Sequence, residues 1–164
     1  MALEKENPDS EQYKIHEKWM AEALELAHQA ASYNEVPVGA VVIENGNIIG
    51  RGFNQPIRTN DPTAHAEIVA LRDAAQHKNN YRLPNSTLYV TIEPCTMCLG
   101  ALIHARTGLL VFGAAEPRAG AVLSRPIMLD SEHYNHQIVY LDGVRDSECG
   151  DVLKEFFKRR RLAK

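Results

Sequence analysis

Two short segments constrain the fold of this chain more than any other feature. The first is Thr63-Ala64-His65-Ala66-Glu67, and the second is Glu93-Pro94-Cys95-Thr96-Met97-Cys98. Each follows a predicted strand or loop and opens a predicted helix, so its reactive side chains stand at a helix start. A histidine and two thiolates are good zinc ligands. A chain that uses all three must bring two helix N-termini together.

The hydrophobic pattern predicts a mixed sheet covered by helices. Apolar residues recur at three- and four-residue spacing over residues 10–34, which indicates an amphipathic helix. Asn45-Gly46 separates two apolar runs and predicts a tight hairpin. Helices and strands then alternate, as in an α/β layered domain. The expected strands are residues 38–44, 47–54, 86–92, 109–113 and 138–141, and the expected later helices are residues 64–76, 95–106 and 146 onward. A polar loop through Asp61-Pro62-Thr63 should precede the helix over 64–76, with Thr63 as its N-cap. Residues 114–137 are expected to form a loop, and a loop of that length is usually functional.

Length and composition favour one globular domain. The 164 residues suit a single domain, which we expect over residues 13–164 behind a flexible N-terminus of residues 1–12. With 45% hydrophobic and 24% charged residues, the chain is neither disordered nor collagen-like. Its longest apolar stretch, residues 37–43, is far short of the ~20 residues that a membrane span needs. No secretory signal opens the sequence, so we expect a cytoplasmic protein without membrane contact.

Charge is distributed unevenly along the chain. The whole sequence has a net charge of −3, whereas residues 154–164 contain six basic residues and one acid and therefore carry +5. A basic tail on an acidic body predicts a local anionic partner. The alternative is that these cations only stabilise the C-terminal end of a helix dipole.

The spacing of the reactive residues favours a catalytic metal site. Three protein ligands leave a fourth position for water, an arrangement typical of catalytic zinc. Two thiolates offset the charge of the ion, so the site needs a base, and Glu67 lies two residues after His65. We expect Glu67 to take a proton from zinc-bound water, which attacks a ring carbon bearing an amino group, and to protonate the ring nitrogen and the leaving ammonia. The alternatives are a structural zinc closed by His104 or Cys149, and thiol redox chemistry.

His65-Ala66-Glu67 with Pro94-Cys95 and Cys98 resembles the signature of the zinc nucleoside and base deaminases. The likeness to bacterial tRNA-specific adenosine deaminases is closer still and covers the chain from about Trp19 to Arg161. The segments that carry it include Glu35-Val36-Pro37-Val38-Gly39-Ala40-Val41, Asp61-Pro62-Thr63, Tyr81-Arg82-Leu83, Thr87-Leu88-Tyr89-Val90-Thr91, Gly100-Ala101, Phe112-Gly113-Ala114, Asn135-His136 and Phe156-Phe157.

This resemblance implies a three-layer α/β/α cytidine-deaminase-like fold with a central mixed five-stranded sheet. It also implies a homodimer that converts adenosine to inosine by hydrolysis at the wobble position of a tRNA anticodon stem-loop. One Zn²⁺ per subunit would be held by His65, Cys95 and Cys98, and Glu67 would shuttle protons. The substrate-binding residues that the resemblance implies are Asn54, Val36, Ala66, Glu116, Arg118, Phe157 and Arg160.

The sequence departs from the family pattern in the loop expected to touch RNA. Glu116-Pro117-Arg118 stands where the family usually has an aspartate and then a lysine, and Leu123-Ser124 stands where Gly-Ser is more usual. These changes lie outside the zinc motifs. They are expected to affect RNA recognition and not the reaction type.

Two other functions use the same residues. A deaminase of a free base or nucleoside, such as cytosine or guanine, would have this centre but no need of Lys158-Arg159-Arg160-Arg161. A non-catalytic RNA-binding subunit would keep zinc only for folding and would have no need of Glu67.

Asn54 also has a simpler interpretation as a turn-forming residue before Gln55-Pro56.

Overall fold

The sheet of this protein begins with a hairpin whose turn contains two residues of positive φ. Strands β1 (Gly39–Glu44) and β2 (Asn47–Phe53) pair antiparallel, and Asn45 and Gly46 between them have φ of 50° and 71°. A type I′ turn requires positive φ at both central positions. The predicted hairpin is confirmed.

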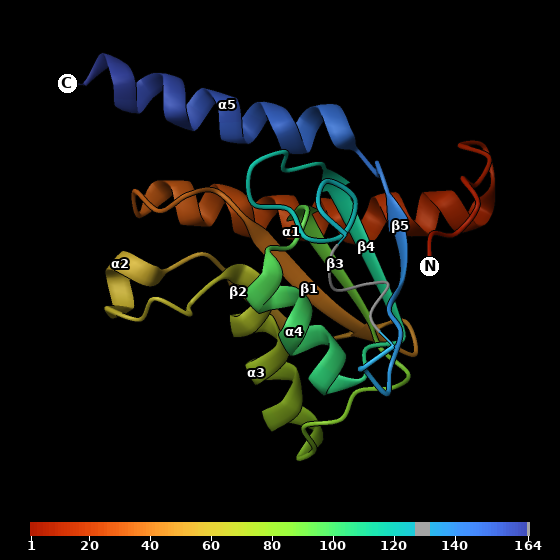
Figure 1. Cartoon of the computed structure of the whole chain (residues 1–164). Helices are drawn as coiled ribbons and strands as arrows, with labels where there is room; N and C mark the ends of the chain where they lie inside the picture. Colours follow the sequence, from red (N-terminus) through yellow and green to blue (C-terminus); the bar gives the residue numbers. More distant parts are fainter. Residues whose placement is uncertain (127–131, 164) are drawn as a thin grey trace.

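The complete sheet is mixed, as expected. A computed structural model describes residues 1–126 and 132–163 and orders the strands β2-β1-β3-β4-β5 (Figure 1). β3 (Thr87–Ile92) pairs antiparallel with β1, and β4 (Leu109–Ala114) and β5 (Val139–Asp142) follow in parallel. The described residues thus form one five-stranded mixed sheet.

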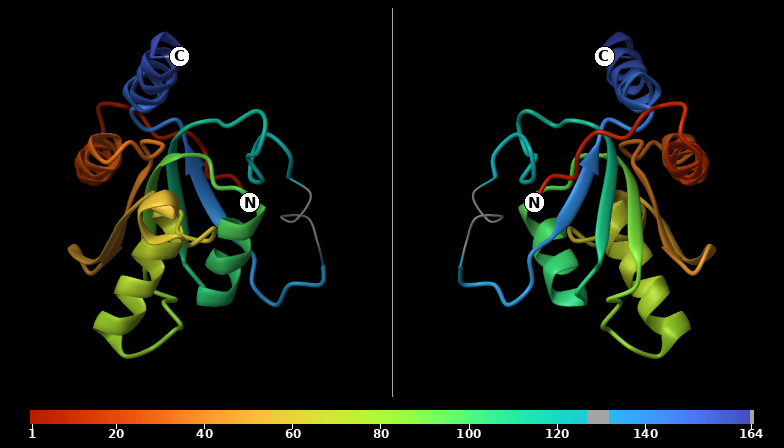
Figure 2. Two further views of the ribbon diagram at one scale, coloured as in Figure 1. Left: turned by 90° about the vertical axis from the view of Figure 1, so that its left-hand side faces the viewer. Right: turned by 90° about the vertical axis from the view of Figure 1, so that its right-hand side faces the viewer.

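Helices cover both faces of the sheet. α1 (Glu11–Ser32) and α5 (Asp146–Leu162) lie on one side, and α3 (Ala66–Lys78) and α4 (Thr96–Ala105) on the other (Figure 2). Glycines allow the close approach: a Cβ at Gly39 would clash with the backbone of α1, and one at Gly50 would clash with α3. The three-layer α/β/α architecture is confirmed.

The central strands are buried on both faces because helices cover both. Val41, Leu88 and Phe112 are fully buried. Such strands have near-continuous apolar sequences instead of strict alternation. Each buried Leu, Val or Phe stabilises the fold by about 1.5–3 kcal/mol relative to an exposed side chain. This packing fixes the positions of the strand ends that precede the site.

Two local predictions before α3 were wrong. The expected loop contains a short helix, α2 (Pro56–Thr59), which begins at a proline and ends at Asn60 with φ of 51°. The N-cap of α3 is His65 and not Thr63. The Thr63 hydroxyl instead donates to Asp61 Oδ1 at 2.7 Å, and that bond holds it in the preceding turn.

The N-terminal residues extend the sheet beyond β5. The amino group of Met1 donates to the carbonyl of Ile138 at 2.7 Å, and the Leu3 N–H donates to the carbonyl of Tyr140 at 2.8 Å. Flexibility of residues 1–12 and a domain boundary at residue 13 stay predictions.

Among residues 1–126 and 132–163, none of the helices combines the length and the apolar character that crossing a bilayer requires.

Candidate active site

Three potential ligand atoms converge where α3 and α4 begin. His65 is the N-cap of α3, Cys95 is the N-cap of α4, and Cys98 lies in the first turn of α4. His65 Nδ1 lies 3.6 Å from the Sγ atom of each cysteine, and all three atoms lie within 4.8 Å of one another. A tetrahedral zinc with bonds of roughly 2.0–2.3 Å needs such separations. The residues therefore fit zinc.

The two thiols differ in acidity. A hydrogen bond from the Cys98 thiol lowers the pKa of Cys95 to about 4. Burial opposes this effect, and His65 adds to it. The same contact, together with burial, raises the pKa of Cys98 far above its ordinary value. Only one thiol ionises readily by itself, whereas a coordinated divalent cation deprotonates both. This donor chemistry also fits a metal centre.

Neither alternative fourth ligand is placed to complete the site. Within the described ranges, the cluster of metal-binding side chains consists of His65, Cys95 and Cys98. His104 lies six residues after Cys98 on α4, about 9 Å further along the helix axis. Cys149 packs against Gly113 on the opposite face of the sheet. The geometry does not support a structural zinc closed by either residue.

Glu67 is a buried acid beside this cluster. It lies in the first turn of α3, and its residue is only 4% exposed. Burial, reinforced by the charge of Cys95, raises the pKa of Glu67 to about 7. A carboxyl group with a pKa near neutrality can both accept and return a proton.

Asn54 connects the hairpin to the cluster. It follows β2, and its Oδ1 accepts a hydrogen bond from the N–H of Ala66 at 2.8 Å. Ala66 is fully buried, and Val36 is half-buried against the core. Asn54 is thus brought next to the metal ligands by a specific contact. Substrate contacts by these three residues stay predictions.

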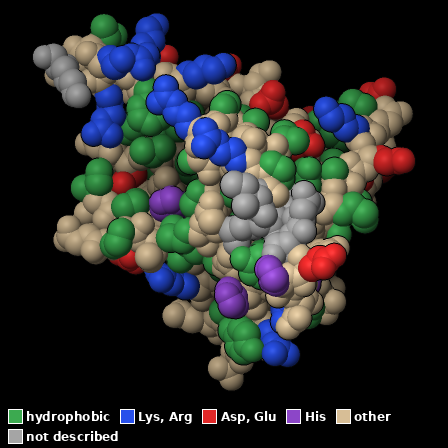
Figure 3. Space-filling view, in the orientation of Figure 1, with side chains coloured by type: hydrophobic (Ala, Val, Ile, Leu, Met, Phe, Trp, Pro, Cys, Tyr) green, Lys and Arg blue, Asp and Glu red, His purple; other side chains and the backbone are tan. Residues whose placement is uncertain are grey.

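A groove lies between the loop after β4 and helix α5. Glu116, Arg118 and Phe157 line this groove of about 400 Å³, together with Leu153, Lys154 and Arg161. Phe157 is 39% exposed and packs edge-on against Phe156, with 5.5 Å between ring centroids. Figure 3 shows Lys and Arg side chains along the exposed side of α5. The structure thus brings together three of the four residues predicted to contact RNA at this edge.

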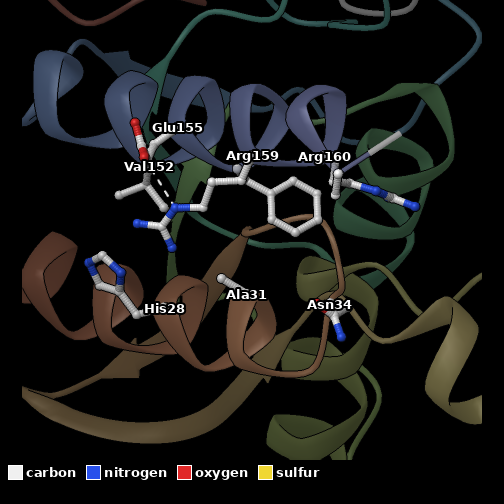
Figure 4. A pocket seen from close by; sticks show the side chains of 9 residues that line it. His28, Ala31, Asn34, Val152, Glu155, Arg159 and Arg160 are labelled. Atoms are coloured by element: carbon white, nitrogen blue, oxygen red, sulfur yellow. Dashed lines mark hydrogen bonds and ion pairs between the residues drawn. The ribbon is translucent and has the colours of Figure 1, made fainter.

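Arg160, the fourth of these residues, lies elsewhere. It lines a second groove of about 300 Å³ between α1 and α5, with His28 and Asn34 on the facing side (Figure 4). Its guanidinium carbon lies 5.5 Å from the ring centroid of Phe156. In that groove Arg159 is paired with Glu155 at 3.1 Å. Arg160 and Phe157 therefore point to different sides of α5.

Comparison with known proteins identifies the centre. Residues 13–114 match the family model described as the cytidine and deoxycytidylate deaminase zinc-binding region. The match contains His65, Glu67, Cys95 and Cys98.

The chain belongs to this deaminase family.

Relatives of the deaminase include proteins named for action on tRNA. It is 52% identical over 152 residues to a tRNA-specific adenosine deaminase of Haemophilus influenzae, covering 92% of this chain and 88% of the relative. A solved structure from work on tRNA:A34 deaminases at the wobble position has 40% identity and a TM-score of 0.81, covering 83% of this chain and 99% of the other. A guanine deaminase from Bacillus subtilis has 33% identity and a TM-score of 0.61 over 74% of this chain and 82% of its own.

Sequence analysis of the deaminase missed the role of Glu93 and did not place the tail cations Lys154 and Arg161 beside Phe157. Lys154 and Arg161 line the groove with Phe157, and their helical spacing from Phe157 was a signal that could have identified them. Glu93 was noted only as part of the cysteine motif. Its carboxylate accepts hydrogen bonds from the loop after β4, and no local sequence pattern predicts a contact between segments so far apart.

Proposed function

We propose that this deaminase converts adenosine to inosine in tRNA, at the wobble position of the anticodon. One observation carries the proposal: the cluster of half-buried His65 and Cys95 with buried Cys98 and Glu67 lies in the same domain as a groove lined by cations and an exposed aromatic ring. The names of the relatives support the choice of tRNA as substrate.

His65, Cys95 and Cys98 would hold the metal, and Glu67 would carry the protons. Zinc, when bound, supplies an activated water molecule as nucleophile. A carboxylate oxygen of Glu67 accepts a proton from the attacking water and returns it to N1 of the adenine ring. Glu67 then passes the second water proton to the exocyclic nitrogen. The C6–N6 bond breaks, ammonia leaves, and C6 keeps the new oxygen, so adenosine and water give inosine and ammonia.

The groove provides the chemistry for an unpaired RNA loop. Bases of single-stranded RNA stack on aromatic side chains, and cations contact the phosphates. Phe157 offers an exposed ring, and Lys154 and Arg161 offer charge beside it. Arg118 lies across the groove from them. A target base must leave its stack to enter a buried site, and a loop nucleotide does so at low cost.

The second candidate is deamination of a free purine base. The likeness to a guanine deaminase favours it, because a free-base enzyme uses the same type of centre. It would gain nothing from Lys154 and Arg161 beside Phe157. A non-catalytic subunit is disfavoured because it would have no reason to bury Glu67 at the cluster.

The test compares a synthetic anticodon stem-loop carrying wobble adenosine with free guanine, cytosine and adenosine, each incubated with zinc-loaded protein. The proposal predicts inosine at the wobble adenosine and a rate that falls as salt rises, because phosphate contacts release counterions. Ammonia release from a free base, with no inosine in the stem-loop, would replace the tRNA proposal with the second candidate.

We further propose that the deaminase acts in the cytoplasm as a homodimer that binds one Zn²⁺ per subunit. An apolar groove between α3 and α4 supports this assembly: Ile68, Leu71 and Ala101 line it beside Tyr81, which is 64% exposed. Exposed apolar patches commonly mark interfaces. Sedimentation equilibrium should give twice the chain mass, and Tyr81→Arg should shift the equilibrium toward monomer. A monomeric wild-type protein at micromolar concentration would contradict the homodimer.

A further inference from the structure

Glu93 is a buried carboxylate that accepts five hydrogen bonds from one loop. Its residue is 3% exposed. Oε1 accepts from the backbone N–H groups of Val122 at 3.1 Å, Leu123 at 2.7 Å and Ser124 at 2.8 Å. Oε2 accepts from the N–H of Glu116 at 2.9 Å and from the Ser124 hydroxyl at 2.5 Å. The acceptor sites of the carboxylate are thus almost filled by residues 116–124.

This arrangement requires a negative charge. Four of its five partners are backbone N–H groups, which only donate and could not accept a hydrogen bond from a protonated carboxyl. A charged acceptor forms stronger hydrogen bonds than a neutral one. A glutamine of the same shape could accept through one oxygen only, and its NH₂ group would face the donors of Glu116 and Ser124.

The same loop is also attached to the metal-ligand segment. The N–H of Ala121 donates to the carbonyl of Pro94 at 2.9 Å, and Gly120 forms an isolated β-bridge with Cys95. A Cβ at Gly120 would clash with the Glu93 carboxylate, so the loop backbone lies directly on that group. Glu93 therefore stands between the ligand Cys95 and the loop.

The loop carries one wall of the groove under α5. Glu116 and Arg118 face Phe157 across it. Glu116 N–H is held by Glu93, and Glu116 Oε1 in turn accepts from the N–H of Arg118 at 3.0 Å. Two consecutive hydrogen bonds therefore connect Glu93 to the position of Arg118.

We propose that Glu93 is a positioning residue that sets substrate affinity, by holding residues 116–124 against the Cys95 segment so that Glu116 and Arg118 face the groove. The inference rests on the proposed function, since the groove is assigned to the RNA loop. Within the part of the chain that the structure describes, the Glu93 carboxylate bonds to Glu116 and residues 122–124 and not to a potential metal ligand or to Glu67, so its effect is expected on binding and not on the proton transfers.

The test compares Glu93→Gln, Glu93→Asp and Ser124→Ala by steady-state kinetics on the anticodon stem-loop. Glu93→Gln should raise KM by at least about tenfold, the effect of losing one charge-assisted hydrogen bond, with kcat and zinc content close to wild type. Glu93→Asp keeps the charge and should recover part of the loss. Ser124→Ala removes one donor and leaves four backbone donors on a charged acceptor, whereas Glu93→Gln weakens all five bonds, so the KM of Ser124→Ala should rise less than that of Glu93→Gln.

Hydrogen exchange gives a readout that does not depend on activity. The amides of Val122, Leu123 and Ser124 should exchange faster in Glu93→Gln, while amides in β3 keep their protection. Wild-type KM or wild-type exchange at these amides in Glu93→Gln would overturn the proposal. If that variant does not fold, an unchanged KM in Glu93→Asp would overturn it, and a raised KM with retained kcat would support it. Wild-type protein that makes no inosine would refute the proposed function, while the exchange data would still test the loop attachment.

Discussion

Asn54 Oδ1 lies 2.8 Å from the backbone nitrogen of Ala66, and this hydrogen bond ties the end of β2 to the first residue of α3. The first four N–H groups of a helix have no acceptor within the helix. His65, the N-cap residue, makes no side-chain cap. Asn54 therefore caps α3 from outside, next to the two side chains, His65 and Glu67, that the proposed chemistry uses.

Two substitutions of Asn54 separate its capping role from its proposed contact with substrate. Asn54→Ala should lower the free energy of unfolding by about 1 kcal/mol through loss of the cap. Asn54→Asp keeps an acceptor and should keep most of that stability, since an acid is favourable at a helix N-terminus. Both variants lose the amide donor and should raise KM for the stem-loop. Denaturant unfolding and kinetics measure both effects, and an Asn54→Asp enzyme with wild-type KM would contradict the contact.

Metal content should separate the ligand cysteine from the buried one. Cys98→Ser should lose stoichiometric zinc and activity, because a serine hydroxyl is a poor replacement for a thiolate. Cys149→Ala is the matched control: it removes a buried cysteine on the opposite face and should keep one zinc per chain. Elemental analysis of both purified variants provides the measurement. A full zinc complement in Cys98→Ser would refute the assignment of the three ligands.

Salt dependence should distinguish charge from stacking in the groove. Arg161→Gln should reduce the slope of log affinity against log salt by about 1, since one phosphate contact is lost. Phe157→Leu should weaken binding about 5- to 150-fold, through loss of stacking worth about 1–3 kcal/mol, and leave the slope unchanged. Arg51→Gln, an exposed change on β2, is the control. Equal slopes for Arg161→Gln and wild type would argue against RNA in this groove.

Acid stability should depend on His16. Its Nδ1 lies 2.9 Å from the Tyr89 hydroxyl, and its Nε2 lies 3.7 Å from Glu6. Burial lowers the pKa of His16, although Glu6 opposes that effect. The unfolded chain then binds the proton more readily than the folded protein, so stability falls as pH drops through about 6.5 toward the folded pKa.

A variant pair makes this pH effect measurable. His16→Gln keeps a hydrogen-bonding group but does not titrate, so its Tm should fall less than that of wild type between pH 7.5 and 5.5. His28→Gln, an exposed change on the same helix, should follow wild type. A parallel decline in His16→Gln and wild type would show that His16 does not carry the effect.

The sequence predicted the sheet and the metal cluster because both have local signals. Asn45-Gly46 specified its own turn, the apolar strands were continuous, and His65, Cys95 and Cys98 stand in short motifs at helix starts. The N-cap of α3 was misassigned to Thr63 because a threonine is the usual cap. Here its hydroxyl donates to Asp61, and the N-cap preferences of residue types do not account for such a specific contact.

Other features depend on contacts between distant segments. Glu93 is separated from Ser124 by 31 residues, and only the folded chain shows that its carboxylate organises that loop. Arg160 and Phe157 are both on α5, yet they line different grooves because of how that helix lies over α1 and the loop after β4. Charge composition predicted a basic helix but not which of its sides carries which residue.

Inosine formation by Glu67→Gln tests the central claim most directly. The measurement is the single-turnover rate on the anticodon stem-loop, with zinc content determined on the same sample and Glu25→Gln, an exposed change on α1, as the control. The account predicts a rate at least about 100-fold below wild type, with one zinc retained and stem-loop affinity preserved. A Glu67→Gln enzyme with full zinc that deaminates within a few-fold of the wild-type rate would contradict it.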